Sequence, residues 1–476
     1  MTSPLAGVFS NAPGLTGRIG GPLGKHARIG GVWYDPVPWS VGAALVSWLI
    51  VMVRQVPCIQ SDPGETINVF PRLCYSDISV LYQNRAALRE GGSVWSGDPP
   101  LEYQPLTAYF IAFTRWVAGL LGAKIAPEAD GAELLHATNL FFALSAVLLF
   151  GCFMALVVIH LQLGAKVAAR HTQGIRRRAW DAVFIALSPA IMTAALINWD
   201  LLAVMLVSLA LLLWARRRPI LAGMVWGIAC SAKLYPLLLL VALLLLCARA
   251  GKGRAFLQFL AGGLGVWLLL NLPLLLTDAT SWSYFYVHIA TRGADLGSLW
   301  YVLQLAGVKW SGPLVVTVLE IVCTALAGVL IIMEVLDAPR RPRVPQVMLL
   351  LLIAFLVCSK EYAPQYALWL LPLVVLARPK LWDIAVWSVS ELLYFLAIWG
   401  FLGGVIGPGT GADRLYWLIV VLRSAVQIWI FIRVVQDMRH PWDDPVRMPY
   451  VDDPLGGVLD HEPDAAWVQA KRANKG

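Results

Sequence analysis

Apolar segments long enough to cross a membrane recur along nearly the whole chain after Trp39. A helix that crosses the hydrocarbon core of a bilayer needs about 20 largely apolar residues. The stretches between these segments are too short for a soluble domain, and only 14% of the 476 residues are charged. Soluble domains carry roughly 25% charged residues. The sequence therefore predicts an all-α polytopic membrane protein.

The chain divides into three parts by composition. Residues 1–38 are polar and rich in Gly and Pro, residues 39–435 contain the apolar segments, and residues 436–476 are polar and rich in Asp and Pro. We expect one membrane domain between two cytoplasmic tails, with the C-terminal tail disordered. The first apolar segment follows Arg18, Lys25 and Arg28 and lies too far from Met1 for an ordinary signal peptide, so we expect that segment to remain in the protein.

The net charge of +8 comes largely from short arginine clusters at the ends of apolar segments. Such clusters orient helices, because Lys and Arg accumulate on the cytoplasmic side of a membrane. No basic stretch is interleaved with aromatic residues, as a nucleic-acid groove requires. The charge predicts topology and argues against a nucleic-acid partner.

The charge pattern also places the long polar loop after the first crossing. The basic segment Lys166–Arg178 belongs with the N-terminal tail in the cytoplasm, so an even number of crossings precedes it. Glu133–His160 is long and nearly free of charge, whereas Tyr103–Gly122 is interrupted by polar residues and is amphipathic. We therefore predict that Glu133–His160 crosses the membrane and that Tyr103–Gly122 lies in the interface. The first outer loop, 58–133, is then extracytoplasmic.

Continuing this count gives about 12 crossings, a second outer loop at 277–312 and both termini inside. The expected crossings are Trp39–Pro57, Glu133–His160, Asp181–Asn198, Trp199–Ala215, Pro219–Ala232, Tyr235–Ala248, Phe256–Leu276, Pro313–Val335, Gln346–Cys358, Tyr362–Ala377, Trp382–Phe401 and Arg414–Val435. Several of these are short, so we expect broken or re-entrant helices among them.

Three polar junctions interrupt the apolar segments, and this topology places all three on the outer side. They are Asn198–Asp200, Ser231–Pro236 and Ser359–Tyr366. Ionisable groups inside a membrane usually face a protein interior or a watery cavity. Any one of these side chains alone is more simply explained by snorkelling or by helix pairing. The four residues Asp200, Lys233, Lys360 and Glu361 on one face, together with Asp77 in the first outer loop, predict a site.

This combination of groups suits transfer from a phosphate-activated donor. A carboxylate such as Asp77 can accept a proton from a hydroxyl nucleophile, and cations can bind a departing phosphate. Lys233 and Lys360 are the leading phosphate-binding candidates, and Arg292 is a third whose simpler interpretation is a solvated loop charge. No nucleotide-binding or metal-binding motif is present, and we expect no cofactor.

The second outer loop is rich in aromatic residues that offer flat faces for a sugar ring. They are Trp282, Tyr284, Tyr286, Trp300 and Tyr301. The ordinary aromatic belt at a membrane interface explains most of them as well. His288 lies in the same stretch as a candidate for binding an acceptor hydroxyl or assisting proton transfer, and a surface position is the simpler interpretation.

Cys58 and Cys74 both lie in the first outer loop, whereas most of the other cysteines lie inside apolar segments. In an extracytoplasmic loop the two can form a disulfide. Two free thiols are the alternative, and the sequence leaves both open.

Several short motifs resemble those of a known family. An acidic residue in the loop after the first span, followed by Glu102-Tyr103-Gln104-Pro105, resembles the GT-C superfamily of polyprenyl-phosphate-sugar glycosyltransferases. The three polar junctions resemble glycosyltransferase family 87, which includes actinobacterial mannosyltransferases acting on lipid glycans. The resemblance runs roughly from Cys74 to Pro372. Gln104 departs from it, because related sequences often carry Pro there, and this leaves the pitch of the interfacial helix open.

The resemblance implies a GT-C-type bundle, a donor such as decaprenyl-phosphate mannose, and inverting transfer to a lipid or glycan acceptor on the outer side of the plasma membrane. Asp77 matches the general base; Asp62, in the same loop, is the rival but lacks the Ile78, Tyr82 and Arg85 pattern that follows Asp77. The substrate-binding candidates are Glu102, Tyr103, Asp200, Tyr235, Glu361, Tyr362, Gln365 and His288.

Arabinofuranose is the alternative sugar, and a lipid-linked sugar transporter or flippase is the alternative function. A non-catalytic scaffold in envelope assembly ranks last, because it does not explain the clustered charges. The transporter alternative rests on the number of expected crossings and on the charges within the membrane. The sequence leaves open the acceptor, the linkage formed and the oligomeric state.

Overall fold

The computed structural model describes residues 35–60, 62–63, 67–168, 179–447 and 452–473. The described residues form helices and loops without a β-strand, as the fold-class prediction requires. Two parts of the sequence analysis fall outside the described residues. They are the expected N-terminal tail up to residue 34 and the arginines at 170–178 that were used to predict the topology.

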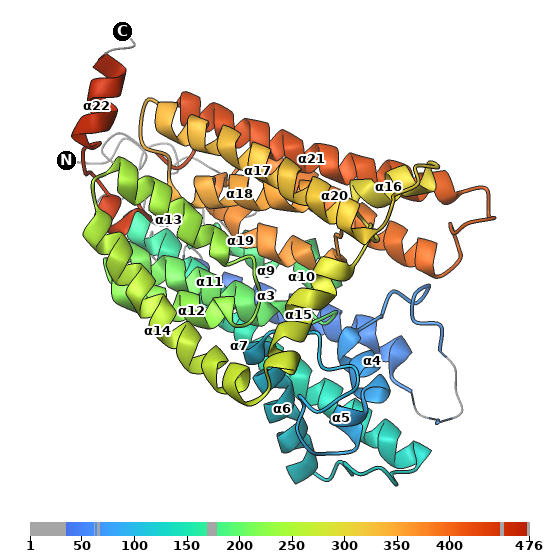
Figure 1. Cartoon of the computed structure of the whole chain (residues 1–476). Coiled ribbons are helices and arrows are strands. Elements are labelled where there is room, and N and C mark those ends of the chain that lie inside the picture. The colour runs from blue at the N-terminus through green and yellow to red at the C-terminus, as the bar shows by residue number, and fades with distance from the viewer. Residues whose placement is uncertain (1–34, 61, 64–66, 169–178, 448–451, 474–476) are drawn as a thin grey trace, which may run out of the picture.

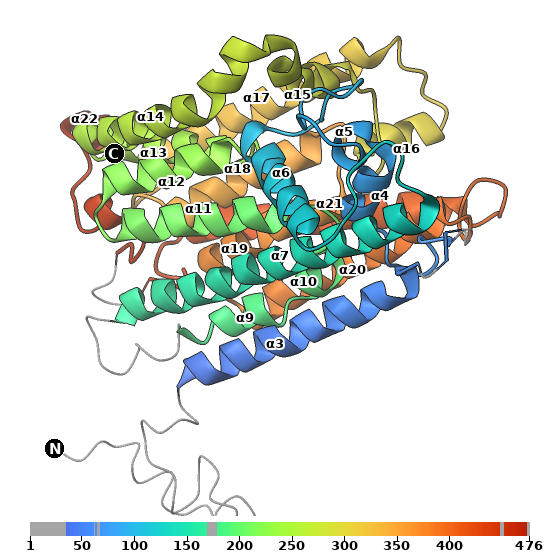
Figure 2. The ribbon, with the colours of Figure 1, turned by 90° about the horizontal axis from the view of Figure 1, so that it is seen from below.

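Six described helices are long and apolar enough to cross a membrane. They are α3 (Pro36–Gln55), α7 (Gly131–Ala168), α14 (Gly253–Thr277), α17 (Pro313–Asp337), α20 (Leu381–Leu402) and α21 (Asp413–Arg439). They run side by side along the length of the bundle, with α3 and α7 adjacent at one edge (Figure 1 and Figure 2). The protein is therefore a multi-pass membrane protein.

The other expected crossings are shorter apolar segments. They are α9 (Ala182–Ala186) followed by α10 (Pro189–Ala194), α11 (Asp200–Ala215), α12 (Pro219–Cys230), α13 (Leu237–Arg249), α18 (Val344–Cys358), and η3 (Pro364–Tyr366) followed by α19 (Ala367–Ala377). At 1.5 Å per residue, a helix of 12 residues such as α12 is only about 18 Å long. The prediction of about 12 crossings therefore stays a prediction, because length supports only six.

Close helix packing surrounds these short segments. A Cβ atom added at Gly223 of α12 would lie 1.9 Å from the carbonyl oxygen of Phe259 in α14, and one at Gly227 would lie 2.2 Å from that of Gly263. Small residues let membrane helices approach closely enough for backbone contact. α18 and α19 are buried on nearly all sides and form the centre of the bundle.

The loop segments gather at one end of the bundle. The first outer loop contains η2 (Val56–Cys58), α4 (Asp77–Asn84), α5 (Ala86–Arg89) and α6 (Pro105–Leu120), and the second contains α15 (Ala279–Thr291) and α16 (Leu299–Leu305). Figure 1 shows α4, α5 and α6 together at this end. α6 packs on α7 and α14 and leaves Phe113, Trp116 and Leu120 exposed, an arrangement compatible with an interfacial helix.

The C-terminal tail packs against the opposite end, where the sequence analysis predicts disorder. Asp444 forms a buried ion pair with Arg343 at 2.8 Å, Arg249 pairs with Asp464 at 3.0 Å, and the Trp214 indole donates to the Gly456 carbonyl at 2.9 Å. η4 (Gly457–Leu459) and α22 (Ala466–Ala473) belong to this segment. Composition alone does not predict this packing, because it depends on the tail's carboxylates pairing with arginines that are buried at helix ends.

Candidate active site

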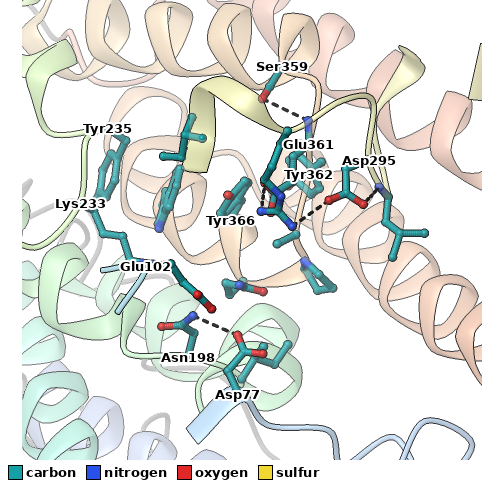
Figure 3. A pocket seen from close by; sticks show the side chains of 18 of the residues that line it. Asp77, Glu102, Asn198, Lys233, Tyr235, Asp295, Ser359, Glu361, Tyr362 and Tyr366 are labelled. Atoms are coloured by element: carbon teal, nitrogen blue, oxygen red, sulfur yellow. Dashed lines mark hydrogen bonds and ion pairs between the residues drawn. The ribbon is translucent and has the colours of Figure 1, made fainter. Parts of the chain in front are cut away.

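The outer loops and the three polar junctions meet around one cavity of about 530 Å³. Of the candidates for catalysis, phosphate binding and substrate binding that the resemblance and the junctions supply, all but Asp200 line it, namely Asp77, Glu102, Tyr103, Lys233, Tyr235, His288, Arg292, Lys360, Glu361, Tyr362 and Gln365. Figure 3 shows Asp77 and Asn198 across the pocket from Glu361 and Asp295, with Lys233 and Tyr235 on a third side. Residues separated by almost 300 positions in the sequence therefore share one cavity.

Asp77 is fixed at the start of α4. Ser76 caps this helix, its hydroxyl donates to the Leu196 carbonyl at 2.5 Å, and the Asp77 backbone N–H donates to the Ile197 carbonyl at 2.7 Å. These bonds attach α4 to the junction before α11. Asp77 therefore keeps a defined position relative to Asn198.

The Asp77 carboxylate accepts a hydrogen bond from the Asn198 side-chain amide at 3.0 Å, and the Tyr75 hydroxyl also hydrogen bonds to it. The same amide contacts the Tyr103 hydroxyl at 3.0 Å. Burial raises the pKa of Asp77, and the bonds from Tyr75 and Asn198 partly offset that effect. Asp62, by contrast, is exposed and does not line the pocket.

Asp200 lies behind the pocket wall. It is fully buried, accepts a hydrogen bond from the Trp369 indole at 2.7 Å, and forms an ion pair with Lys233 at 3.3 Å. Asp200 does not line the pocket, and its expected substrate-binding role stays a prediction. Lys233 also lies 5.8 Å from the centre of the Tyr103 ring.

Arg292 and Lys360 both have protein partners. Arg292 pairs with Glu361 at 2.6 Å and with Asp295 at 2.8 Å, and the Lys360 ammonium donates to the Thr317 hydroxyl at 2.7 Å. The Arg292 side chain is 38% exposed as well as paired, so its phosphate-binding role stays a prediction.

Carboxylates outnumber cations in the pocket lining. The carboxylates are Asp77, Glu102, Asp295, Glu320 and Glu361, and the cations are Lys233, Arg292 and Lys360. Glu102 pairs with Arg85 outside the lining. Among the described residues, no group of three or more His, Cys, Asp or Glu side chains could hold a metal ion.

A buried polar network supports the far wall of the pocket. The Tyr362 hydroxyl donates to Glu391 at 3.0 Å, Gln427 donates to both at 3.1 and 2.9 Å, and the Arg423 guanidinium lies 3.5 Å from the centre of the Tyr362 ring. Arg423 also donates to the Gly297 carbonyl at 3.0 Å. The network joins α20 and α21 to both loops that carry Arg292 and Glu361.

The comparison with known families gives one match. Residues 103–359, more than half of the chain, match the model of glycosyltransferase family 87. The chain belongs to this family. A search of curated proteins found no match.

Membership of family 87 confirms the resemblance seen in the sequence and makes the protein a GT-C-like membrane glycosyltransferase. The matched region contains Asn198, Lys233 and the second outer loop. Asp77 and the segment from Lys360 onward lie outside it, and the fold brings them to the same cavity.

Some aromatic residues in the pocket of this family 87 protein differ from those expected. His288 lines the pocket, but Trp282, Tyr284, Tyr286, Trp300 and Tyr301 do not. The lining instead contains a stack of Tyr235, Trp369 and Tyr366, with ring centres 4.6 and 4.0 Å apart, and a second group of Phe70, Tyr75 and Trp399.

The sequence carries a signal for only one of these two groups. Tyr366 and Trp369 are three residues apart, a spacing that places them on one helix face next to the third junction. Phe70 and Trp399 are distant in sequence, and no local pattern connects them. Cys58 and Cys74 form a disulfide beside the second group. Of the two alternatives for these cysteines, a disulfide or two free thiols, the structure shows the disulfide.

Proposed function

We propose that the protein transfers a sugar from a polyprenyl-phosphate donor to a hydroxyl group of a lipid-linked or cell-envelope glycan, on the extracytoplasmic side of the plasma membrane. The proposed sugar is mannose, with arabinofuranose as the alternative, and the transfer inverts the anomeric centre. The observation that carries the proposal is the position of Asp77, a partly buried carboxylate that lines the pocket and is oriented by Asn198.

In the proposed reaction Asp77 is the general base. It takes the proton of the acceptor hydroxyl while the hydroxyl oxygen attacks the anomeric carbon of the donor. The bond between that carbon and the phosphate oxygen breaks, and its electron pair leaves with the polyprenyl phosphate. A raised pKa makes the carboxylate a stronger proton acceptor than an ordinary aspartate.

Lys233 is the best-supported ligand for the donor phosphate. Its ion-pair partner Asp200 reaches it from behind the pocket wall, and an ammonium group has three donors, so the pocket side can receive a phosphate oxygen. Arg292 and Lys360 would contribute by sharing their remaining N–H donors with the phosphate. The negative charge that develops on the leaving group is then stabilised where it forms.

The lengths of the short helices support a lipid-linked donor. α11 and α13 begin at the pocket and α12 and α18 end there. Since α12 measures about 18 Å and the hydrocarbon core is about 30 Å thick, a helix of this length that starts at one face of the core ends about 12 Å short of the other face. The pocket would then reach into the outer half of the hydrocarbon core, where a donor held in the bilayer by its polyprenyl chain can enter it.

The test compares Asp77→Asn with Asp62→Asn in purified protein supplied with labelled decaprenyl-phosphate mannose and an acceptor glycoside. We expect Asp77→Asn to lower transfer by about 10²- to 10⁴-fold, because the amide cannot accept the proton, while donor binding and folding persist. Asp62→Asn should behave as wild type, because that side chain is exposed and outside the pocket.

Wild-type turnover in the Asp77→Asn variant would rule out the assignment of the base. The same assay separates the transporter alternative, because a flippase leaves the donor intact whereas a transferase releases free polyprenyl phosphate. Membership of family 87 favours the transferase.

A further inference from the structure

Three aromatic side chains form one wall of the pocket beside Asp77. Phe70 and Tyr75 come from the first outer loop and Trp399 from α20, and all three line the cavity. Their ring centres are 5.3 Å apart for Phe70 and Tyr75, 5.7 Å for Phe70 and Trp399, and 5.0 Å for Tyr75 and Trp399. We call these three residues the aromatic wall.

Trp399 is the most deeply buried member of the aromatic wall. It is only 4% exposed, and its indole N–H has no hydrogen-bond partner among the described residues. That N–H is closed off from solvent, so a bound molecule would meet the ring of Trp399, which lines the pocket, and not its N–H. An aromatic ring offers a large and rigid apolar surface for such a contact.

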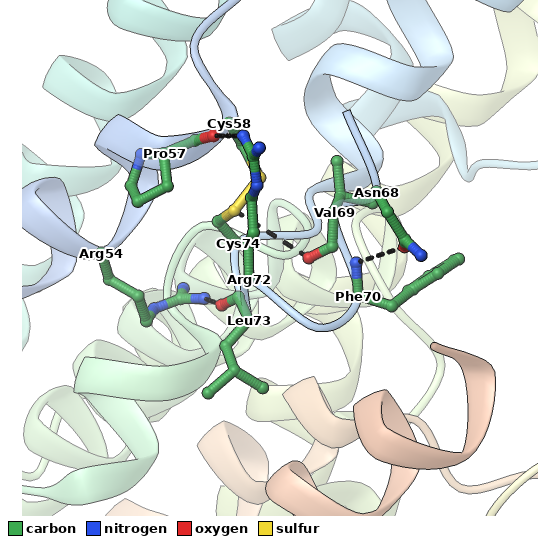
Figure 4. The surroundings of a disulfide bond; sticks show 9 residues. All are labelled: Arg54, Pro57, Cys58, Asn68, Val69, Phe70, Arg72, Leu73 and Cys74. Carbon is green, nitrogen blue, oxygen red and sulfur yellow. Dashed lines mark hydrogen bonds between the residues drawn. A yellow bond between two sulfur atoms is a disulfide. The ribbon is translucent and has the colours of Figure 1, made fainter. Parts of the chain in front are cut away.

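The loop that carries Phe70 and Tyr75 is fastened at several points (Figure 4). The disulfide between Cys58 and Cys74 closes it, Arg54 donates to the Leu73 carbonyl, and the Leu73 N–H donates to the Phe70 carbonyl at 2.9 Å. These bonds connect the part of the loop around Phe70 and Tyr75 to the end of α3, next to α20.

The same loop connects the aromatic wall to the proposed base. Tyr75 precedes Asp77 by two residues, and its hydroxyl hydrogen bonds to the Asp77 carboxylate. A sugar ring stacked on the wall would present its hydroxyls close to Asp77. Arg292 and Lys360, which are phosphate-binding candidates, come from the loops after α15 and α18. The wall thus fits the acceptor, whose hydroxyl the base must reach.

We propose that Phe70, Tyr75 and Trp399 form an acceptor subsite, which binds one sugar ring of the acceptor glycan by stacking. The proposal rests on the proposed function. Phe70, Tyr75 and Trp399 all lie outside residues 103–359, so the acceptor subsite is built from parts of the chain that the family match does not include.

The experiment measures KM for donor and acceptor separately in purified protein. The donor is labelled decaprenyl-phosphate mannose, and the acceptor probes are octyl α-mannoside, octyl arabinofuranoside and extracted membrane glycolipids. We expect Trp399→Ala to raise the acceptor KM about tenfold or more, as loss of a buried aromatic anchor does, and to leave the donor KM unchanged. Trp399→Phe keeps a smaller aromatic ring at the same position, so we expect a smaller rise of about threefold.

Trp382→Ala is the matched control, because Trp382 lies on the same helix, is 73% exposed and does not line the pocket. Both of its KM values should equal those of wild type. An unchanged donor KM in the Trp399 variants also shows that they fold.

Two results would overturn the acceptor subsite while the proposed function stands. One is an acceptor KM that is unchanged in both Trp399 variants. The other is a rise in the donor KM of these variants without a rise in their acceptor KM. Failure of the wild type to transfer sugar to any of the probes would instead overturn the proposed function, and the subsite with it.

Discussion

Asp77 and Asp62 lie in the same loop, and the difference between them is their surroundings. Asp77 is held by Ser76, Tyr75 and Asn198 at the edge of the pocket, whereas Asp62 is exposed. A carboxylate removed from water is harder to ionise, and its hydrogen bonds restore part of the lost stabilisation. This balance sets the pH range in which the proposed base can work.

The pH dependence of kcat/KM should report the raised pKa of Asp77. The base acts only when ionised, so activity falls as the pH decreases through that pKa. Because burial raises the pKa, we expect the acid limb at a pH above the ordinary range of an aspartate. Tyr75→Phe removes a bond that lowers the pKa, so it should move this limb to still higher pH.

A pH profile of the wild type and of Tyr75→Phe checks both statements. The phenylalanine ring keeps the aromatic wall, so the acceptor KM serves as the internal control and should change little. An acid limb that stays in place in Tyr75→Phe would contradict the assignment of that limb to Asp77.

At the scale of the elements, one side of the pocket depends on two loops that pair with each other. The Asp295 N–H donates to the Lys360 carbonyl at 2.8 Å, and the Tyr362 N–H donates to the Leu296 carbonyl at 3.0 Å. Gly297 follows this pairing with φ of +76°, and Arg423 binds its carbonyl. The positions of Arg292 and Glu361 therefore depend on the contact between these two loops.

Gly297→Ala should weaken this contact. The added Cβ would lie 2.0 Å from the Tyr394 hydroxyl and 2.3 Å from the Tyr362 carbonyl oxygen, and a positive φ costs a non-glycine residue roughly 1–3 kcal/mol. We expect a lower unfolding temperature in detergent and reduced transfer. Gly293→Ala is the control in the same loop, because a Cβ there meets nothing within 4 Å, and equal effects of both substitutions would refute the explanation.

At the scale of the whole molecule, the pocket and the C-terminal tail lie at opposite ends of the bundle. The tail binds the ends of α11, α13 and the start of α18, while the other ends of these helices reach the pocket. Charge bias predicts the tail in the cytoplasm. The disulfide in the first outer loop favours an oxidising compartment for the pocket end.

Cysteine labelling tests this orientation. In a variant whose five free cysteines are replaced by alanine, Lys309→Cys places a thiol in the exposed second outer loop and Trp442→Cys places one in the exposed start of the tail. We expect a membrane-impermeant maleimide to label the former in sealed right-side-out vesicles and the latter only after permeabilisation. The reverse pattern would place the pocket in the cytoplasm.

The amino-acid sequence by itself determined the class of the protein and much of the pocket. Apolar length predicted the helices, and the three polar junctions marked Lys233, Lys360 and Glu361, because a charge among apolar residues is unusual wherever it occurs. The motifs also predicted the family, which the match over residues 103–359 confirmed.

Only the tertiary structure decided how the side chains of the pocket are partnered. It placed Asp200 behind Lys233, paired Arg292 with Glu361 and brought Trp399 to Phe70. It also ordered the C-terminal tail on the buried arginines at the helix ends. Such contacts join residues far apart in the chain, and they depend on helix lengths and close packing that no local pattern of residues encodes. The sequence thus shows which charged side chains need an ion-pair or hydrogen-bond partner, and the tertiary structure determines which residues those partners are.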